Sequence, residues 1–220
     1  MKMIHAIPLD LAMKAVLLDR DGVINELVYH QEAGIIDSPF TLSQFRVFPG
    51  VPQAIRQFNN MGLAVAVVSN QPGIAKGHLT RELLDCFEQK MLSEVASAGG
   101  RIDAIHYCLH HPEAVVPELR QRCRCRKPEP GLLESAARGL SVALSDCYMI
   151  GDGIPDLLAG TTAGCRTVFI GRWKCQICQF TEAPHTRPAF AATTLLKASE
   201  IIRAEINGKP YTSAQTLCAD

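Results

Sequence analysis

Two aspartates that directly follow a short apolar run are the feature that most constrains this chain. The run at 15–18 ends at Asp19, Asp21 comes two residues later, and Gly22 interrupts regular structure. Side chains alternate along an extended chain, so the two carboxylates face the same way if the extension persists. Carboxylates this close repel each other unless they share a cation or a proton. Open α/β sheets place active sites at the carboxyl ends of buried strands, so the pattern predicts an α/β fold and a metal-assisted reaction.

Apolar runs typical of buried strands alternate with amphipathic stretches typical of helices. Between Leu79 and Val95 an apolar residue recurs at every fourth position, which predicts a helix over about 79–98. The alternation implies a three-layer, Rossmann-like α/β fold with a central parallel sheet. Strands are predicted at 14–18, 63–70, 102–109, 147–152 and 166–171, and further helices at 49–62, 131–140 and 193–206.

Length and composition exclude several classes of protein. The 220 residues suffice for a core, so we expect a single domain over 1–220 with a loose tail from about 205 to 220. Twenty-two basic residues balance twenty-two acidic ones, which does not favour a nucleic-acid or membrane-surface protein. Asp10 and Lys14 interrupt the N-terminal apolar residues, and no apolar stretch is long enough to span a bilayer. We therefore expect a cytoplasmic protein without a signal peptide or membrane partner.

Three further segments offer groups that suit phosphate chemistry. SNQPGIAKG (69–77) follows a predicted strand and combines the Ser69 hydroxyl with backbone amides suited to an anion. Lys127 precedes a helix start stiffened by proline, and GDGIPD (151–156) places Asp152 at a strand exit. Each segment alone is also compatible with a turn, a helix cap or a solvated charge. Together they predict phosphoryl transfer, in which a carboxylate attacks phosphorus while Mg²⁺, lysine and amides neutralise charge.

A second group of residues has the spacing of a metal site. Cys108, His110, Cys123 and Cys125 form C-x-H and C-x-C pairs separated by twelve residues. Such pairs can close a tetrahedral zinc site, and four protein ligands indicate a structural ion. His111 is a competing ligand that we expect to pack beside the site. In a chain without an export signal, metal binding is favoured over a disulfide framework.

The segments DRDGVIN, SNQ, the lysine before Pro128 and GDGIPD, in this order, resemble the four motifs of the haloacid dehalogenase (HAD) superfamily of phosphohydrolases. The resemblance covers residues 14–171. It implies Asp19 as the nucleophile, Asp21 as the general acid and base, Ser69 and Lys127 as phosphoryl contacts, and Asp19, the backbone carbonyl of Asp21, and Asp152 as ligands of Mg²⁺.

The cysteine-containing segments YCLHHPE and CRCRKP narrow this resemblance. They are similar to a zinc-containing subgroup that includes heptose 1,7-bisphosphate and histidinol-phosphate phosphatases. In that subgroup a zinc loop, here 108–125, replaces a large cap domain, so we expect structural Zn²⁺ and no large cap. The resemblance further implies that Asn70, Gln71, Pro72 and Arg126 contact the substrate, with Arg126 at a distal phosphate.

The resemblance implies a Mg²⁺-dependent phosphatase acting on a small phosphorylated metabolite. A D-glycero-D-manno-heptose 1,7-bisphosphate, cleaved at position 7, is the leading sugar bisphosphate. Histidinol phosphate, another metabolite or a nucleic-acid 3′-phosphate are alternatives, because Gly153 replaces a lysine usual in the heptose enzymes and the segment 29–45 is longer than the usual flap. Cys175 and Cys178 have C-x-x-C spacing without a second pair; we expect ordinary loop cysteines, with a redox pair as an alternative.

Two alternatives of another class receive less support. Arginines around Cys123 and Cys125 would suit a zinc module that binds nucleic acid, but the chain is neutral and has few aromatic residues for base stacking. A non-catalytic relative would not need all four charged motif residues. We expect the protein to act as a monomer.

Overall fold

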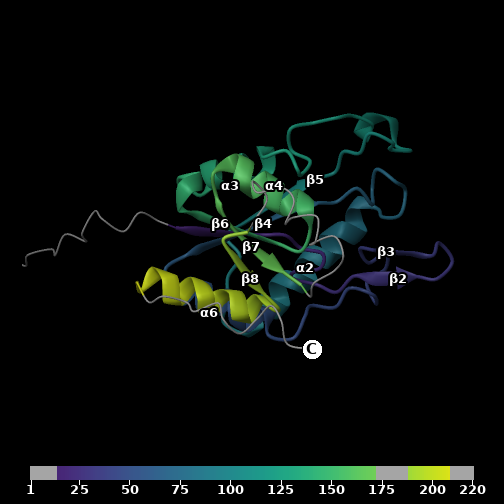
Figure 1. Cartoon of the computed structure of the whole chain (residues 1–220). Helices are drawn as coiled ribbons and strands as arrows, with labels where there is room; N and C mark the ends of the chain where they lie inside the picture. The colour runs from purple at the N-terminus through teal and green to yellow at the C-terminus, as the bar shows by residue number, and fades with distance from the viewer. Residues whose placement is uncertain (1–13, 172–187, 209–220) are drawn as a thin grey trace, which may run out of the picture.

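The computed structural model describes residues 14–171 and 188–208, in which the apolar runs form a six-stranded parallel sheet (Figure 1). The five predicted strands are confirmed with slightly shorter bounds, and a sixth short strand was not predicted. The strand order is β5-β4-β1-β6-β7-β8. The bounds are β1 (Ala15–Leu18), β4 (Ala64–Asn70), β5 (Ala104–Cys108), β6 (Cys147–Gly151), β7 (Arg166–Ile170) and β8 (Phe190–Ala192).

Strand β1 lies at the centre of the sheet. It pairs with β4 through Leu18 and Val67 and with β6 through Leu18 and Ile150, among other partners. All four residues of β1 are fully buried, which explains why its sequence is uniformly apolar. Val16 and Leu18 contribute to the core cluster on one face of the sheet, while the alternate residues contribute to the cluster on the other.

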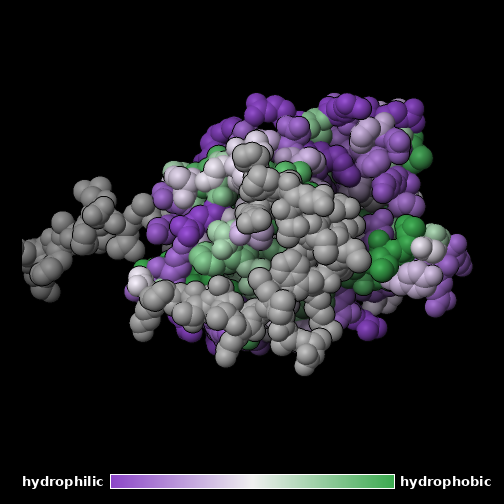
Figure 2. Space-filling view, in the orientation of Figure 1, coloured by the Kyte–Doolittle hydropathy of each residue, from purple (hydrophilic) through white to green (hydrophobic). Residues whose placement is uncertain are grey.

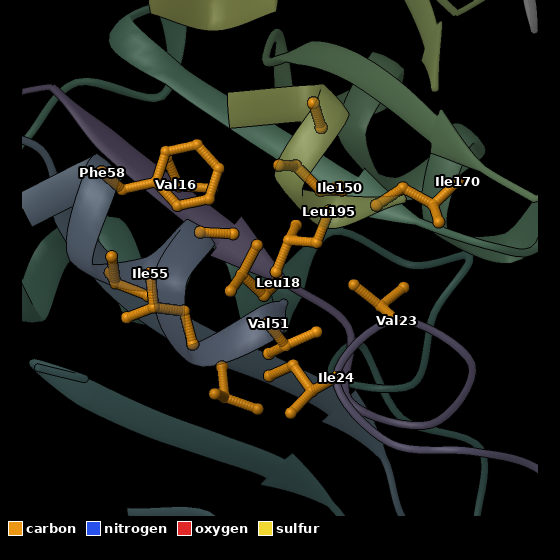
Figure 3. Close-up of a cluster of buried hydrophobic side chains, with 14 of the residues drawn as sticks. Val16, Leu18, Val23, Ile24, Val51, Ile55, Phe58, Ile150, Ile170 and Leu195 are labelled. Carbon is orange, nitrogen blue, oxygen red and sulfur yellow. The ribbon is translucent and has the colours of Figure 1, made fainter. Parts of the chain in front are cut away.

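Helices cover both faces of the sheet. Figure 1 shows α3 (Gly131–Gly139) and α4 (Ile154–Ala163) on one side and α6 (Leu195–Ile206) on the other. The helices α1 (Val51–Asn60) and α2 (Arg81–Ser97) share the core cluster with α6. Figure 3 shows this core where side chains of β1 meet those of α1 and α6. The three layers that the sequence predicts are therefore present.

Two helices differ from the prediction. Helix α2 begins at Arg81 because the Thr80 hydroxyl caps it, accepting a hydrogen bond from the backbone N–H of Leu83 at 3.2 Å. Helix α4 was not predicted, since Gly160 weakens its helical pattern. A Cβ at Gly160 would lie 2.6 Å from Thr167 Cγ2, so this glycine lets α4 pack closely on the sheet.

Two insertions lie at the carboxyl end of the sheet. The first carries an antiparallel hairpin, β2 (Val28–His30) and β3 (Ile35–Asp37), within the long predicted flap. Figure 2 shows an apolar surface where this hairpin lies, and Tyr29 and Ile36 are 61% and 70% exposed. The second joins β5 to α3 and contains the short helix η1 (Pro117–Leu119); another short helix, η2 (Leu144–Asp146), precedes β6. Within 14–171 and 188–208 these insertions form only a small cap.

Helix α6 continues to Ile206, because apolar residues on one of its faces pack into the core, and the loose tail expected from about 205 stays a prediction. Residues 209–220 lie outside the described ranges, as do Cys175 and Cys178. In the part of the chain that the structure describes, no helix has both the length and the apolarity to cross a bilayer.

The strand order reverses direction beside β1. From the centre, the chain runs outward to β4 and β5 and then returns to build β6, β7 and β8 on the other side. The connections that leave β1 and β6 pass to opposite faces, so the carboxyl ends of these two strands diverge. Such a switch point is where open α/β sheets bind ligands, and Asp19 and Asp152 stand there.

Candidate active site

Asp19 is held at the end of β1 by three donors to one oxygen. Its own N–H donates to the carbonyl of Ile150 at 2.9 Å, which extends the pairing with β6. Its Oδ1 accepts hydrogen bonds from Ser69 Oγ at 2.6 Å and from the backbone N–H of Arg20 at 2.7 Å. Lys127 Nζ lies 3.0 Å from the same oxygen. These contacts fix the orientation of the carboxylate, and the predicted residues Ser69 and Lys127 do meet Asp19.

Lys127 is a buried cation between two carboxylates. It is 3% exposed, and its Nζ lies 2.5 Å from Asp156 Oδ1 and donates to the carbonyl of Val68 at 2.8 Å. Burial lowers the pKa of Lys127, but Asp156 and Asp19 outweigh burial and raise it to about 12. The ammonium therefore stays charged throughout the neutral range.

Asp156 is a site residue to which the sequence interpretation gave no role. It lies in the first turn of α4, 3% exposed, and its Oδ2 accepts a hydrogen bond from the backbone N–H of Gly153 at 3.0 Å. Burial and the charge of Asp19 raise the pKa of its carboxyl, against the lowering effect of Lys127. Its place four residues after Asp152 in GDGIPD was the available signal.

The carboxylates of Asp19, Asp152 and Asp156 converge, each with an oxygen within 4.8 Å of the others. Three carboxylates face one lysine, so the group carries excess negative charge when all are ionised. Oxygen donors of this kind are what Mg²⁺ prefers. The side chain of Asp21 is not in this group, which is compatible with the carbonyl contact expected of it. We call Asp19, Asp21, Lys127, Asp152 and Asp156 the aspartate site.

Two glycines allow the carboxylates to approach. Gly22 has a φ of +86°, and a Cβ there would lie 2.1 Å from Asp152 Oδ2. A Cβ at Gly151 would lie 2.1 Å from Asp156 Cβ. Real side chains do not tolerate such distances, so these positions require glycine for the aspartate site to keep its shape.

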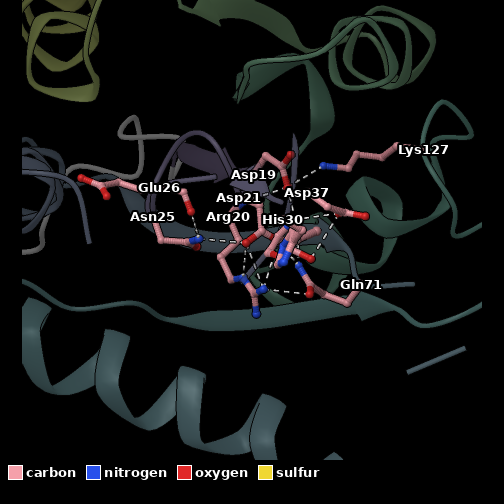
Figure 4. Close-up of polar contacts among 11 residues, drawn as sticks. Asp19, Arg20, Asp21, Asn25, Glu26, His30, Asp37, Gln71 and Lys127 are labelled. Carbon is pink, nitrogen blue, oxygen red and sulfur yellow. Dashed lines mark hydrogen bonds and ion pairs between the residues drawn. The ribbon is translucent and has the colours of Figure 1, made fainter. Parts of the chain in front are cut away.

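Asp21 binds a different set of donors (Figure 4). Gln71 Nε2 donates to its Oδ2 at 2.5 Å, and Asn25 Nδ2 donates to its Oδ1 at 2.9 Å. Arg20 forms an ion pair with the same carboxylate at 3.0 Å. Asp19 contacts Ser69 within β4 and Asp21 contacts Gln71 just after that strand, and Arg20 is a participant that the sequence interpretation missed.

The side chain of Asn70 pairs with the backbone of Lys127. Its Nδ2 donates to the Lys127 carbonyl and its Oδ1 accepts from the Lys127 N–H, both at 3.0 Å. This pair of hydrogen bonds to the backbone places the lysine opposite Asp19. The substrate contact expected of Asn70 would have to be made beside these bonds.

Arg126 lines a basic cavity next to Lys127. The cavity has a volume of about 530 Å³. Arg126 also donates a hydrogen bond to the carbonyl of His110 at 3.3 Å, which ties it to the cysteine-containing loop. The cavity lining comprises Pro112, Arg122, Cys123, Arg124, Arg126, Lys127, Pro128 and Glu129.

Pro72, expected to line the pocket, opens the turn after β4, where its carbonyl accepts a hydrogen bond from the N–H of Lys76 at 2.8 Å.

The four predicted zinc ligands form one group, which we call the cysteine cluster (Cys108, His110, Cys123 and Cys125). Cys125 Sγ lies 3.0 Å from Cys108 Sγ, 3.2 Å from Cys123 Sγ and 3.3 Å from His110 Nδ1. A tetrahedral ion with Zn–S bonds of about 2.3 Å requires S···S separations of about 3.8 Å, so a small expansion would accommodate it. Three sulfur atoms and one nitrogen are a donor set that suits zinc.

His111 does not join the cysteine cluster. Its Nδ1 accepts a hydrogen bond from the backbone N–H of Glu113 at 3.1 Å, within its own turn. The loop beyond it docks on the turn after β4, because the N–H groups of Val115 and Val116 donate to the carbonyl of Ala75 at 2.8 and 3.2 Å. The cysteine cluster therefore lies between β5, this loop and the segment that leads to Lys127.

Known proteins resemble this chain in sequence and in structure. The family described as HAD-hydrolase-like matches residues 124–198. The D-glycero-beta-D-manno-heptose-1,7-bisphosphate 7-phosphatase of Escherichia coli (strain K12) is 38% identical over 161 residues, which are 73% of this chain and 80% of that protein. The protein of the same name from Haemophilus ducreyi is 36% identical over 160 residues, which are 72% and 83%.

A solved structure extends the likeness to the fold. The D,D-heptose 1,7-bisphosphate phosphatase from B. bronchiseptica, complexed with magnesium and phosphate, matches with a TM-score of 0.72 at 28% identity, over 88% of this chain and 99% of that one. This match and the six-stranded parallel sheet confirm the predicted HAD-like α/β fold.

Proposed function

Because the chain belongs to the HAD-like phosphatase family of the D-glycero-beta-D-manno-heptose-1,7-bisphosphate 7-phosphatases, we propose that it hydrolyses the 7-phosphate of such a heptose bisphosphate. The observation that carries the proposal is the arrangement around Asp19, where Ser69, Lys127 and two further carboxylates converge on one strand end. The alternatives, histidinol phosphate and a nucleic-acid 3′-phosphate, receive no comparable support. A zinc module for nucleic acid would not need this arrangement.

In the proposed reaction Asp19 is the nucleophile. Three donors hold its Oδ1, so we assign the attack on phosphorus to Oδ2. The new bond gives an aspartyl phosphate, and the ester bond to the sugar oxygen breaks. Lys127 and the Ser69 hydroxyl lie where they can neutralise charge on the transferring phosphoryl group. Splitting hydrolysis into two displacements lowers the barrier of each.

Asp21 is assigned the proton transfers. It protonates the leaving sugar oxygen in the first step and takes a proton from the attacking water in the second, so the carboxyl group is regenerated in each cycle. The contacts with Gln71 and Asn25 hold its carboxylate beside the nucleophile. Asn70 acts through Lys127, since both of its bonds to the backbone serve to orient that residue.

We infer that Asp19, Asp152 and the backbone carbonyl of Asp21 hold Mg²⁺. The excess negative charge of the converging carboxylates and their oxygen donors fit a small divalent cation. When bound, Mg²⁺ would supply positive charge that offsets the negative charge of the phosphate oxygens. Asp156 is better placed as the partner of Lys127, which it contacts at 2.5 Å.

The cysteine cluster is proposed to hold a structural Zn²⁺. All four donors come from the protein, which is the arrangement of structural sites. The last ligand, Cys125, is followed directly by Arg126 and Lys127, so the ion would fix both in register. Arg126, which lines the basic cavity, is the proposed contact for the distal phosphate at position 1. It would supply the positive charge that a lysine gives in the heptose enzymes, where this chain has Gly153.

The cellular setting is also part of the proposal. The described cysteines form no disulfide bond, as expected in the reducing cytoplasm, where we place the protein. We further propose that the protein acts as a monomeric, single-domain enzyme, as its sequence predicts.

A substrate panel tests the proposal. Purified protein with Mg²⁺ is given both anomers of the heptose 1,7-bisphosphate, heptose 7-phosphate, histidinol phosphate and a 3′-phosphorylated oligonucleotide. We expect the highest kcat/KM for the β-anomer of the bisphosphate, with the 1-phosphate retained in the product as seen by phosphorus NMR. A higher kcat/KM for histidinol phosphate or the oligonucleotide would overturn the substrate assignment, and no phosphate release from any ester would overturn the phosphatase.

A further inference from the structure

Arg20 is a fully buried cation that the proposed reaction does not use. It stands between the two aspartates of the first motif and is 0% exposed. Burying an unpaired guanidinium would cost several kcal/mol, so its surroundings must compensate. The residues that face it therefore indicate what it is for.

Aromatic side chains enclose the guanidinium. Its Cζ lies 5.6 Å from the ring centroid of Phe45 and 5.7 Å from those of Phe87 and Tyr107. Phe45 and Phe87 are themselves stacked, with centroids 5.0 Å apart. Cation–π attraction favours this placement, and three rings leave the guanidinium little freedom to move. The three rings, which we call the aromatic cage, therefore fix the position of the cation.

The free edge of the guanidinium is directed at the catalytic region. Its Nη2 donates to both carboxylate oxygens of Asp21 at 3.0 Å and to Gln71 Oε1 at 2.8 Å. Gln71 in turn donates to Asp21 at 2.5 Å and to Ser69 Oγ at 3.1 Å. Arg20, Gln71 and Asp21 thus form a closed triangle of hydrogen bonds, drawn in Figure 4. The amide oxygen and nitrogen of Gln71 each have a fixed partner, which defines its orientation.

We propose that Arg20, braced by its aromatic cage, is a positioning residue that holds the Asp21 carboxyl group in line with the leaving oxygen of the substrate. The inference rests on the proposed function, in which Asp21 donates that proton. As the bond from Asp19 to phosphorus forms and the ester bond breaks, one proton passes from Asp21 to the leaving oxygen. In the second step water attacks phosphorus, the bond from phosphorus to Asp19 breaks, and a proton from that water returns to Asp21. In this role Arg20 acts through Asp21 and is assigned no contact with the substrate.

A leaving-group series separates this role from simple structural support. A nitrophenolate is a good leaving group that departs without protonation, whereas an alkoxide must be protonated as it leaves. The parameter kcat/KM reports only the steps through the first phosphoryl transfer. For Arg20→Met, which keeps an apolar chain in the cage, we expect kcat/KM for an alkyl phosphate to fall about 100-fold more than that for p-nitrophenyl phosphate. Arg20→Lys, which keeps the charge, should recover part of the difference.

Matched variants keep the test decisive. Arg81→Met removes an arginine whose side chain is 60% exposed, and its leaving-group dependence should equal that of the wild type. Gln71→Leu removes the other side of the triangle and should reproduce the selective loss, so it decides the matter if Arg20→Met does not fold. In an Asp21→Asn background, Arg20→Met should add almost nothing, because both changes remove the same proton transfer.

Equal losses for alkyl and aryl phosphates in folded Arg20→Met and Gln71→Leu would overturn the positioning role and leave the proposed function standing. Additive losses in the Asp21→Asn background would overturn it as well. Failure of the proposed function would look different, because the wild-type protein would then release no phosphate from any ester.

Discussion

The aspartate site and the cysteine cluster can each hold a metal ion, yet they are assembled in opposite ways. The aspartate site collects residues from the carboxyl end of β1, the segment before α3, the turn after β6 and the first turn of α4, far apart in sequence. The cysteine cluster takes all its donors from one stretch, 108–125. Hydrogen bonds and ion pairs already hold the aspartate site together, whereas the cluster stands at the base of a loop with few buried residues.

Strand β5 shows how closely the two regions are joined. Tyr107 packs on the core that underlies the aspartate site and faces Arg20, while its neighbour Cys108 points to the other face and into the cysteine cluster. Consecutive residues of one strand thus serve different sites, because side chains alternate between the faces of a sheet. The residues proposed for the chemistry are thus anchored on the sheet, whereas the proposed zinc ligands tie the neighbouring loop to it.

The largest expected effect is the loss of turnover in Asp19→Asn. The amide cannot attack phosphorus, so kcat should fall by at least about 1,000-fold, equivalent to about 4 kcal/mol of activation free energy. The melting temperature should stay near that of the wild type or rise, because a carboxylate crowded by others is removed. Phosphate release and thermal unfolding are measured beside Asp85→Asn, an exposed aspartate of α2. A fall in kcat smaller than about 1,000-fold would refute the role of Asp19 as the nucleophile.

Cys125→Ser should act first on stability. Substitutions that remove a structural metal are among the most destabilising. We therefore expect the free energy of unfolding to fall by about 4 kcal/mol, with loss of bound zinc. Turnover should fall in parallel as Arg126 and Lys127 lose their register. Zinc content and urea unfolding are compared with Cys86→Ser, an exposed cysteine of α2. Unchanged stability together with full zinc content would contradict the comparison of the two sites.

Gly22→Ala should damage the aspartate site with little effect on the cysteine cluster. The new methyl group would collide with Asp152, and the residue would keep an unfavourable positive φ. We expect the Mg²⁺ concentration for half-maximal activity to rise and kcat/KM to fall about 100-fold, or about 2.7 kcal/mol. Zinc content should not change. Gly34→Ala, at an open turn with a φ of +65°, controls for backbone strain alone. An equal loss in both variants would show that strain explains the effect.

The smallest effect is on how the free energy of unfolding depends on pH under alkaline conditions. Burial raises the pKa of Tyr107 to about 12 in the folded chain, against about 10 when unfolded. The folded state thus holds this proton more tightly, so the free energy of unfolding falls as pH rises from about 10 to about 12, by up to about 1.4 kcal/mol per pH unit. Tyr107→Phe should flatten that slope in urea unfolding, whereas Tyr29→Phe, at an exposed tyrosine, should not. A slope unchanged by Tyr107→Phe would exclude Tyr107 as the cause.

Some parts of the fold could not be predicted from local patterns. Strand β8 has only three residues and exists because β7 offers an unpaired edge, a partner that no local pattern reveals. Helix α4 was hidden because its Gly160 is needed for close packing against the sheet. The hairpin β2–β3 lacks a typical two-residue turn between its strands.

The residues of the candidate site also fall into those that the sequence predicted and those that it missed. Motif spacing identified Asp19, Ser69, Lys127 and Asp152, because each follows a strand or opens a helix in a recognisable order. It did not identify Arg20 or Asp156, whose meaning depends on partners far away in sequence. A charged residue beside an aspartate is ordinary on a surface; only burial shows that Arg20 needs the cage formed by Phe45 and its neighbours.

By itself the sequence determined the alternation of strands and helices and the superfamily, and it predicted two groups of metal-ligating residues, because these depend on local periodicity and on the order of short motifs. Only the tertiary structure decided which side chains bond to one another: that Asn70 holds the backbone of Lys127, that Asp156 pairs with its ammonium, and that Arg20 reaches Asp21 together with Gln71. Such contacts arise from the strand order, which brings distant strand ends to one edge of the sheet.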